Sequence, residues 1–279
     1  MKLVRFGEGE IGAVEGDRIV ALDGIATGMA ELLAFWPARA SAAAEMVRAA
    51  RRAVPLKATR LLAPIARPGK ILAIGLNYAD HIAETGREKP QHQTWFAKMP
   101  TAVNGPHDPI VIPAGCTTVD YEAELVAVIG RGGRRISRED APNHVAGYCC
   151  GNDVTERSWQ QRSSQWIVGK SCDTHAPVGP WITTADEIPD PHALAIRCLV
   201  NGETRQESNT RHLVFDLWDQ IAHVSAAMTL EPGDLIFTGT PGGVGMAMKP
   251  PRFLKPGDTV RVEIDGLGAL EAKMVAEDA

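Results

Sequence analysis

Residues 120–130 read DYEAELVAVIG and hold two glutamates two positions apart, Glu122 and Glu124. The segment 125–129 is apolar at every position, which predicts a strand that is buried on both faces. Side chains alternate along a strand, so both glutamates share a face with Val126. Unpaired buried charge is costly, and adjacent carboxylates raise each other's pKa. A divalent cation would remove both problems, so this stretch predicts a metal site.

A third carboxylate follows the next apolar run. Residues 145–150 predict a second strand, and Asp153 comes just after its end. Three carboxylates without a nearby Cys-x-x-Cys or His-x-x-x-His motif favour Mg²⁺ or Mn²⁺ over zinc. The alternative is a solvated strand end with two exposed glutamates, because the E-x-E pattern is common. Glu122, Glu124 and Asp153 are therefore the candidate metal ligands.

The composition of the chain limits its partners and its location. The 279 residues carry a net charge of −5, whereas nucleic acids and anionic membranes call for basic patches. Five cysteines without zinc or redox spacing fit a reducing compartment. No apolar run reaches transmembrane length, and the N-terminus lacks the apolar core of a signal peptide. We therefore expect a cytoplasmic protein that binds a small molecule and neither nucleic acid nor membrane.

The chain divides into a small and a large part. Residues 1–65 predict short strands and an Ala-rich helical stretch, 28–53, that is interrupted near Pro37. Residues 66–279 are mostly strands, and Asn201-Gly202 predicts a type I′ hairpin. One amphipathic helix is predicted from the spacing of Leu213, Leu217, Ile221, Val224 and Met228. Many strands and few helices, without a βαβ rhythm, predict an α+β fold with a small N-terminal domain and a larger second domain.

Four further segments carry a family resemblance. They read GLNYADHIAE at 75–84, DVTERSWQ at 153–160, WIVGKSCDT at 166–174 and GDLIFTGTP at 233–241. With residues 120–130 they closely resemble the fumarylacetoacetate hydrolase family. The resemblance implies that residues 66–279 form a layered, predominantly β roll with catalytic function, and that the protein is a homodimer. It also implies that Mg²⁺ or Mn²⁺ is held by three acidic side chains, which fall on Glu122, Glu124 and Asp153.

His81 and Glu84 form a candidate acid–base pair. They share one face if residues 79–85 form a short helix that ends near Gly86. A carboxylate beside an imidazole orients it and makes it a better base, which suits it to activate water or to move a proton at carbon. The alternative is an exposed surface pair of modest consequence. The resemblance implies the catalytic role, on a segment that orders over the substrate.

Lys170 is the third candidate catalytic residue. A lysine in partly apolar surroundings near a dication would have a lowered pKa and would donate to an enolate oxygen; the alternative is a surface lysine. The resemblance implies that Lys170, Arg157 and Gln160 point toward the substrate. If residues 153–160 are helical, Asp153, Arg157 and Gln160 share a face. The resemblance also places Thr240 near a substrate carboxylate, and Lys98 is assigned to substrate binding.

The metal indicates the class of substrate. A 2-oxo acid chelates a dication, which polarises the ketone and stabilises the enolate. Water attack, decarboxylation and proton relocation all use that enolate. The segments 245–251 and 179–181 resemble family members that act on 2,4-dioxo sugar acids and acylpyruvates, which favours hydrolysis of a C–C bond in a 2,4-dioxo acid.

Two alternatives to this hydrolase remain open. The same site would suit a 2-hydroxy-diene-dioate isomerase or a 2-oxo-acid decarboxylase. A non-catalytic protein that binds a metal and an oxo acid belongs to another class, and it would leave His81, Glu84 and Lys170 without a role.

Overall fold

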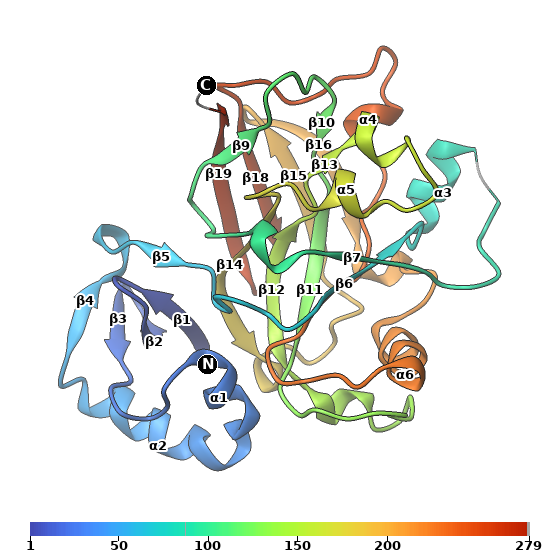
Figure 1. The fold of residues 1–279 in the computed structure, drawn as a ribbon. Coiled ribbons are helices and arrows are strands. Elements are labelled where there is room, and N and C mark those ends of the chain that lie inside the picture. Colours follow the sequence, from blue (N-terminus) through green and yellow to red (C-terminus); the bar gives the residue numbers. More distant parts are fainter. Residues whose placement is uncertain (87, 278–279) are drawn as a thin grey trace.

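Two mixed β-sheets dominate the computed structural model, which describes residues 1–86 and 88–277 (Figure 1). Helices are few and lie at the edges of the sheets, so the predicted α+β class is confirmed. In the described residues twelve strands form the larger sheet, in the order β4-β3-β2-β1-β14-β12-β11-β17-β6-β7, with β5 paired to β1 and β8 paired to β14. These strands are β1 (Lys2–Phe6), β2 (Glu10–Glu15), β3 (Arg18–Ala21), β4 (Ala53–Pro55), β5 (Leu61–Leu62), β6 (Ile71–Gly75), β7 (Thr94–Lys98), β8 (Val103–Asn104), β11 (Ala123–Ile129), β12 (Val145–Asn152), β14 (Ala176–Thr184) and β17 (Leu235–Phe237).

The smaller sheet packs against the middle of the larger one. Its order is β16-β15-β18-β19-β9, and β15, β18 and β19 contact β11, β12 and β14. Its strands are β9 (Ile110–Ile112), β15 (Ala195–Val200), β16 (Glu203–Asn209), β18 (Thr259–Ile264) and β19 (Gly268–Ala276). A two-stranded ladder joins β10 (Val119–Asp120) to β13 (Thr155–Glu156). The result is a layered arrangement with β11 and β12 at its centre (Figure 1).

The position of β11 between two cores explains its uninterrupted apolar sequence. Leu125, Ala127 and Ile129 pack in the core shared with the smaller sheet. Val126 and Val128 pack on the opposite side, in the core shared with the N-terminal part of the chain. All seven residues of β11 are buried, so the prediction of a strand buried on both faces is confirmed.

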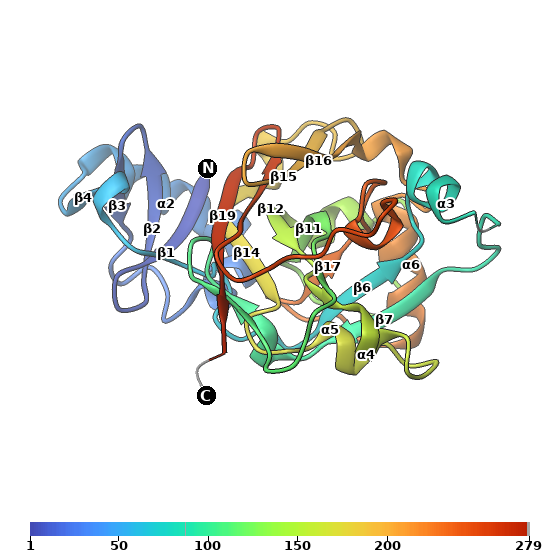
Figure 2. The same ribbon diagram turned by 90° about the horizontal axis from the view of Figure 1, so that it is seen from above.

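The helices are short, and three of them carry predicted site residues. Those three are α3 (Ala79–Thr85), α4 (Arg157–Gln160) and α5 (Ile167–Lys170). Helices α4 and α5 contact each other, whereas α3 lies apart from them (Figure 2). The short helix predicted at 79–85 is confirmed, and Gly86 caps it with a φ of 66°, in the left-handed region that glycine tolerates. The other helices are α1 (Met29–Ala34), α2 (Trp36–Ala49) and α6 (Leu217–Ala227).

The N-terminal part of the chain extends the larger sheet. Strand β1 pairs with β14, and α1 contributes Met29, Leu32 and Leu33 to the core on the Val126 side of β11. Figure 2 shows this part on the side of the molecule away from α3. The division into a domain of residues 1–65 and a second domain of residues 66–279 stays a prediction. None of the helices described is both long and apolar enough to cross a membrane.

Two local predictions had different outcomes. The hairpin at Asn201-Gly202 is confirmed, with φ values of 52° and 79° between β15 and β16, as a type I′ turn requires. The amphipathic helix begins at Leu217 rather than Leu213. Its N-cap is Asp216, whose side chain accepts a hydrogen bond from the Asp219 amide at 2.9 Å. The apolar spacing extended the predicted helix back to Leu213, but the Asp216 cap fixes its start at Leu217.

Replacement of Asp216 by alanine should lower the free energy of unfolding by about 1 kcal/mol, because an amide of the first turn of α6 loses its acceptor. Asp216 also forms an ion pair with Arg138. The matched control is therefore Arg138→Ala, which removes the ion pair and keeps the cap. Since half-exposed ion pairs contribute little, the control should cost less than Asp216→Ala in urea unfolding. Equal losses in the two variants would assign the stability to the ion pair.

Candidate active site and metal centre

The three predicted metal ligands meet at the end of the β11–β12 ladder. The antiparallel register pairs Ala123 with Asn152, and the Asp153 amide donates to the Glu122 carbonyl at 2.9 Å. Glu122, Glu124 and Asp153 each offer a carboxylate oxygen, and these atoms lie within 4.8 Å of one another. All three side chains are buried, which excludes the alternative of a solvated strand end.

Three buried cations surround this cluster. Lys170 Nζ donates to Glu122 Oε2 at 2.8 Å and to Asp153 Oδ2 at 2.6 Å. Lys98 Nζ contacts Asp153 Oδ1 at 2.5 Å. Arg157 contacts Glu122 Oε1 at 2.6 Å. Each contact offsets part of the cost of burying a carboxylate.

The charges are distributed unequally over the trio. Burial opposes ionisation of Glu122, but the charges of Lys170 and Arg157 outweigh burial and lower the pKa of Glu122 to about 2. Burial together with the neighbouring carboxylates of Asp153 and Glu122 raises the pKa of Glu124 well above its usual range. Its Oε2 accepts one hydrogen bond, from the Gly239 amide at 2.7 Å. Glu124 is thus the carboxylate for which an added cation would bring the largest electrostatic gain.

This donor set fits a hard divalent ion. Three buried carboxylates with converging oxygens and no sulfur or nitrogen ligand among them suit Mg²⁺ or Mn²⁺. Burial first, and the facing carboxylates second, disfavour the ionised form of Glu124, and a bound dication would favour it. Glu122, Glu124 and Asp153 are the residues that would hold the ion.

Lys170 is buried, so the alternative of a surface lysine does not describe it. Burial lowers the pKa of Lys170, but Asp153 and Glu122 raise it more, and the net direction is upward. The prediction considered apolar surroundings and a dication. The structure instead places two carboxylates on the ammonium group.

Arg157 and Gln160 lie on α4, but Asp153 does not share a face with them. Residues 155–156 form β13, so the helix begins only at Arg157, and the predicted helical run from 153 is wrong. The ladder with β10 holds these two residues extended. Arg157 and Gln160 are nevertheless adjacent, since Arg157 Nη1 donates to Gln160 Oε1 at 3.1 Å.

The prediction missed Asp120, which orients Arg157. Arg157 Nε donates to Asp120 Oδ2 at 2.9 Å, and the Gly245 and Met246 amides donate to the same carboxylate. Asp120 is fully buried. Its position two residues before Glu122 was the available signal, because a buried aspartate near a charged cluster needs a cationic partner.

Lys98 does not line the cavity, in contrast to its predicted role in substrate binding. It is the last residue of β7, and its side chain is fully buried beside Asp153. Its Nζ also donates to the Val154 carbonyl at 3.1 Å. These contacts direct Lys98 to the metal-ligand cluster rather than to a bound substrate.

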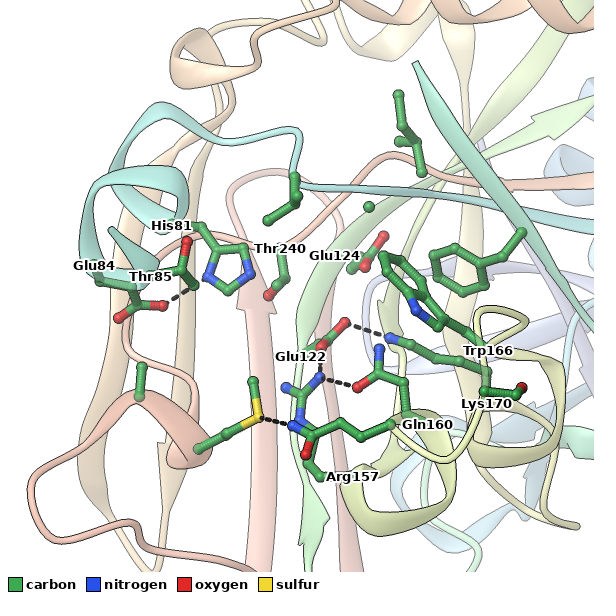
Figure 3. A pocket seen from close by; sticks show the side chains of 18 residues that line it. His81, Glu84, Thr85, Glu122, Glu124, Arg157, Gln160, Trp166, Lys170 and Thr240 are labelled. Atoms are coloured by element: carbon green, nitrogen blue, oxygen red, sulfur yellow. Dashed lines mark hydrogen bonds and ion pairs between the residues drawn. The ribbon is translucent and has the colours of Figure 1, made fainter. Parts of the chain in front are cut away.

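His81 and Glu84 face the cluster from α3. Glu84 Oε1 lies 2.6 Å from His81 Nδ1, and Figure 3 shows the second ring nitrogen on the side that faces the interior of the cavity. Glu84 Oε2 accepts a hydrogen bond from the Gly243 amide at 2.7 Å, which ties α3 to the glycine-rich loop 239–245. His81 is buried, so the alternative of an exposed pair does not describe it.

Thr240 lies on the same glycine-rich loop and its side chain is held in place. Its hydroxyl donates to the Ala123 carbonyl at 3.0 Å and accepts from Gln206 Nε2 at 2.8 Å. The threonine therefore lies at the N-terminal end of β11, beside Glu124 (Figure 3).

These groups border one cavity of about 540 Å³ (Figure 3). His81 and Glu84 line one side, and Glu122, Glu124 and Lys170 line the other. Of the remaining predicted residues, Arg157, Gln160 and Thr240 also line it, whereas Asp153 and Lys98 do not.

An aromatic wall covers Lys170 on the cavity side. Lys170 Nζ lies 4.8 Å from the ring centre of Phe96, and Phe96 packs edge-to-face against Trp166. The Trp166 ring occupies the space where a side chain on Gly75 would begin, 2.5 Å from an ideal Cβ. This packing requires glycine at position 75 and excludes water from one side of the ammonium group.

Substitution of Gly169 by alanine should reduce kcat/KM and stability together. A Cβ at Gly169 would lie 2.3 Å from the Gln160 amide nitrogen and 2.7 Å from the Glu156 carbonyl oxygen. Both atoms are backbone, so α4 and α5 must separate, which moves Arg157 and Lys170. We expect a loss of about 1–3 kcal/mol in urea unfolding. Gly28→Ala, where an added Cβ meets no atom within 4 Å, is the control. Wild-type activity and stability in Gly169→Ala would show that the α4–α5 contact is not needed.

Comparison with known proteins places these features in a family. Residues 70–275 match the family model described as fumarylacetoacetate (FAA) hydrolase C-terminal. The chain is 41% identical to an oxaloacetate tautomerase, Fahd2a, of Rattus norvegicus, over 99% of this chain and 92% of the rat protein.

Solved structures agree with this match. The maleylpyruvate hydrolase of Sphingobium sp. SYK-6, in complex with manganese(II) and pyruvate, is 35% identical with a TM-score of 0.85, and each chain is covered completely. A 2-hydroxyhepta-2,4-diene-1,7-dioate isomerase from Mycobacterium marinum is 33% identical with a TM-score of 0.80, again with complete coverage of both chains. The sequence match over most of the chain and the shared fold show that this protein belongs to the fumarylacetoacetate hydrolase family.

Proposed function

We propose that this protein is a Mg²⁺- or Mn²⁺-dependent enzyme that moves a proton on the enol form of a 2-oxo acid, with oxaloacetate tautomerisation as its reaction. The observation that carries the proposal is the shared cavity: His81 with Glu84 on one wall, and Glu122, Glu124 and Lys170 on the other. A substrate bound between these walls would meet both an acid–base group and a charge-stabilising group.

The metal centre sets the position of the substrate. A dication held by Glu122, Glu124 and Asp153 would act as a Lewis acid toward the carboxylate and 2-oxo oxygens of the acid. The manganese and pyruvate bound to the Sphingobium hydrolase support this assignment, because pyruvate is the simplest 2-oxo acid with a C3 carbon.

The His81–Glu84 pair supplies the proton transfer. Glu84 Oε1 accepts from Nδ1, which leaves Nε2 to take a proton from C3 of the keto form and to deliver a proton to the 2-oxygen of the resulting enolate. In the reverse direction the enol loses its O–H proton and C3 gains one. Glu84 is itself fixed by the Gly243 amide, so the imidazole is oriented before substrate arrives.

Lys170, Arg157 and Gln160 handle the negative charge of the enolate. Lys170 is held between the carboxylates and the Phe96 ring, where water is largely excluded and charge stabilisation is strong. Gln160 Nε2 and the Thr240 hydroxyl extend the polar lining around the site that the substrate carboxylate would occupy.

The choice between tautomerisation and hydrolysis rests on the relatives. The sequence favoured hydrolysis of a C–C bond in a 2,4-dioxo acid, and a maleylpyruvate hydrolase of closely similar structure keeps it as the second candidate. The oxaloacetate tautomerases are 41–50% identical, which favours tautomerisation. Hydrolysis uses the same proton-transfer pair, now to deprotonate the water that attacks C4.

A non-catalytic binding protein is the weaker alternative. Such a protein would have no use for a buried imidazole aligned by a carboxylate on the wall opposite the metal ligands. The homodimer and the cytoplasmic location stay predictions.

Purified protein with Mg²⁺ or Mn²⁺ should accelerate ketonisation of enol-oxaloacetate. The rate is measured as the loss of the enol absorbance. The acceleration should disappear after exhaustive chelation and return when metal is added, because the trio alone cannot stabilise an enolate. A parallel panel of acylpyruvates and 2-hydroxy-diene-dioates tests the alternatives. Turnover of an acylpyruvate alone would shift the assignment to hydrolysis. Activity that survives chelation would contradict the metal-dependent mechanism.

His81→Ala and Glu84→Gln should each lower kcat, by about 10²- to 10⁴-fold for the histidine, with a small effect on KM. The reason is that a proton-transfer group acts mainly in the transition state. The double variant should be no slower than His81→Ala, because Glu84 acts through the imidazole. The measurement is steady-state kinetics of all three variants. Strictly additive losses would mean that the two residues work independently.

A further inference from the structure

Lys98 is a buried cation with contacts that differ from those of the cavity lysine. Its side chain is fully buried and does not line the cavity. Its Nζ contacts two acceptors, Asp153 Oδ1 at 2.5 Å and the Val154 carbonyl at 3.1 Å. Burial disfavours the charged form of a lysine, so a retained ammonium group at this position needs a specific partner. That partner is the Asp153 carboxylate.

The two oxygens of Asp153 have different neighbours. Oδ1 faces Lys98 behind the cluster, and Oδ2 faces Lys170, which lines the cavity. Lys98 therefore occupies the Asp153 oxygen that is not bound to the cavity lysine. Oδ2 shares the Lys170 ammonium group with Glu122 Oε2, so it is the Asp153 oxygen that is joined to another member of the trio.

The backbone gives Lys98 little freedom to move. It ends β7, where its pairing with Ile71 of β6 fixes the Cα. The Val154 carbonyl fixes the other end of the side chain. The ammonium group is thus held by a backbone carbonyl as well as by the Asp153 carboxylate, which distinguishes it from an isolated ion pair.

We propose that Lys98 is a positioning residue for the metal site: it clamps Asp153 Oδ1 and thereby presents Oδ2 as a single ligand oxygen. This inference rests on the proposed metal-dependent function. It assigns Lys98 to metal affinity and not to substrate binding. Partners of metal ligands that lie outside the coordination shell orient those ligands, and their loss weakens metal binding by about 10- to 100-fold.

Isothermal titration with Mn²⁺ tests the assignment in wild type, Lys98→Met and Lys98→Gln. We expect the Kd of both Lys98 variants to rise by about 10- to 100-fold, while wild type binds normally. Lys89→Met is the matched control, since Lys89 is exposed and the chemical change is the same. Thermal unfolding in EDTA and circular dichroism establish that each variant is folded.

The kinetic readout separates the two roles of Lys98. If Lys98 positions Asp153, KM for oxaloacetate measured at saturating Mn²⁺ should return close to the wild-type value. A wild-type Kd for Mn²⁺ together with a raised KM would overturn the proposal and restore substrate binding. If the wild-type protein binds Mn²⁺ but turns over no 2-oxo acid, the proposed function is contradicted. In that case a raised Kd for Mn²⁺ in the Lys98 variants would still support the role of Lys98. Wild type that binds no Mn²⁺ would overturn both.

A structure of the wild-type protein with Mn²⁺ tests the clamp without any substitution, in case neither variant folds. We expect Asp153 to bind the ion through Oδ2 alone, with Lys98 Nζ still within hydrogen-bond distance of Oδ1. Two Asp153 oxygens on the ion, or a Lys98 side chain turned into the cavity, would overturn the proposal.

Discussion

The pairing of β11 with β12 is the constraint on which the site depends. Its antiparallel register places Asp153 beside Glu122, so that one carboxylate from each side of the ladder meets Glu124. Both strands are buried on both faces. A shift of their pairing register by one residue would therefore move core side chains to the opposite face of the sheet. The cores that stabilise the fold thereby also hold the metal ligands in place. Stability and ligand geometry are determined by the same packing.

Concentrating carboxylates at the end of a buried ladder has an electrostatic cost, which nearby cations offset. Glu122 and Asp153 share Lys170, Asp153 also has Lys98, and Glu122 also has Arg157. Glu124 has none of these contacts, and burial together with the charges of Asp153 and Glu122 raises its pKa. The protein supplies cations for two of the three ligands and leaves the third to be neutralised by an ion. This imbalance supports the proposal that the cluster binds a dication and is not a closed network of ion pairs.

The glycine-rich loop 239–245 links the proposed acid–base pair, His81 and Glu84, to the carboxylate cluster. Asp80 accepts from the Gly242 amide and Glu84 from the Gly243 amide, so both ends of α3 are tied to residues 239–245. The same loop carries Thr240, and it places the Gly239 amide on Glu124. Gly243 has a φ of 102°, and a Cβ there would lie 2.0 Å from the Arg205 carbonyl oxygen, so only glycine allows this approach. One backbone segment therefore sets the distance between the two walls of the cavity.

The sequence by itself determined the elements whose signals are local. The apolar run of β11, the Gly86-capped helix with His81 and Glu84, and the Asn201-Gly202 hairpin all follow from side-chain period or turn chemistry. The candidate ligands were also visible, because charge beside a buried strand needs a partner. Only the tertiary structure decided the strand register, the extended residues before α4, the role of Asp120 and the direction in which Lys98 points. Each of these depends on contacts between segments far apart in the chain. A side chain such as that of Lys98 can contact either a substrate or a metal-ligand residue, and the fold decides which of them lies beside it.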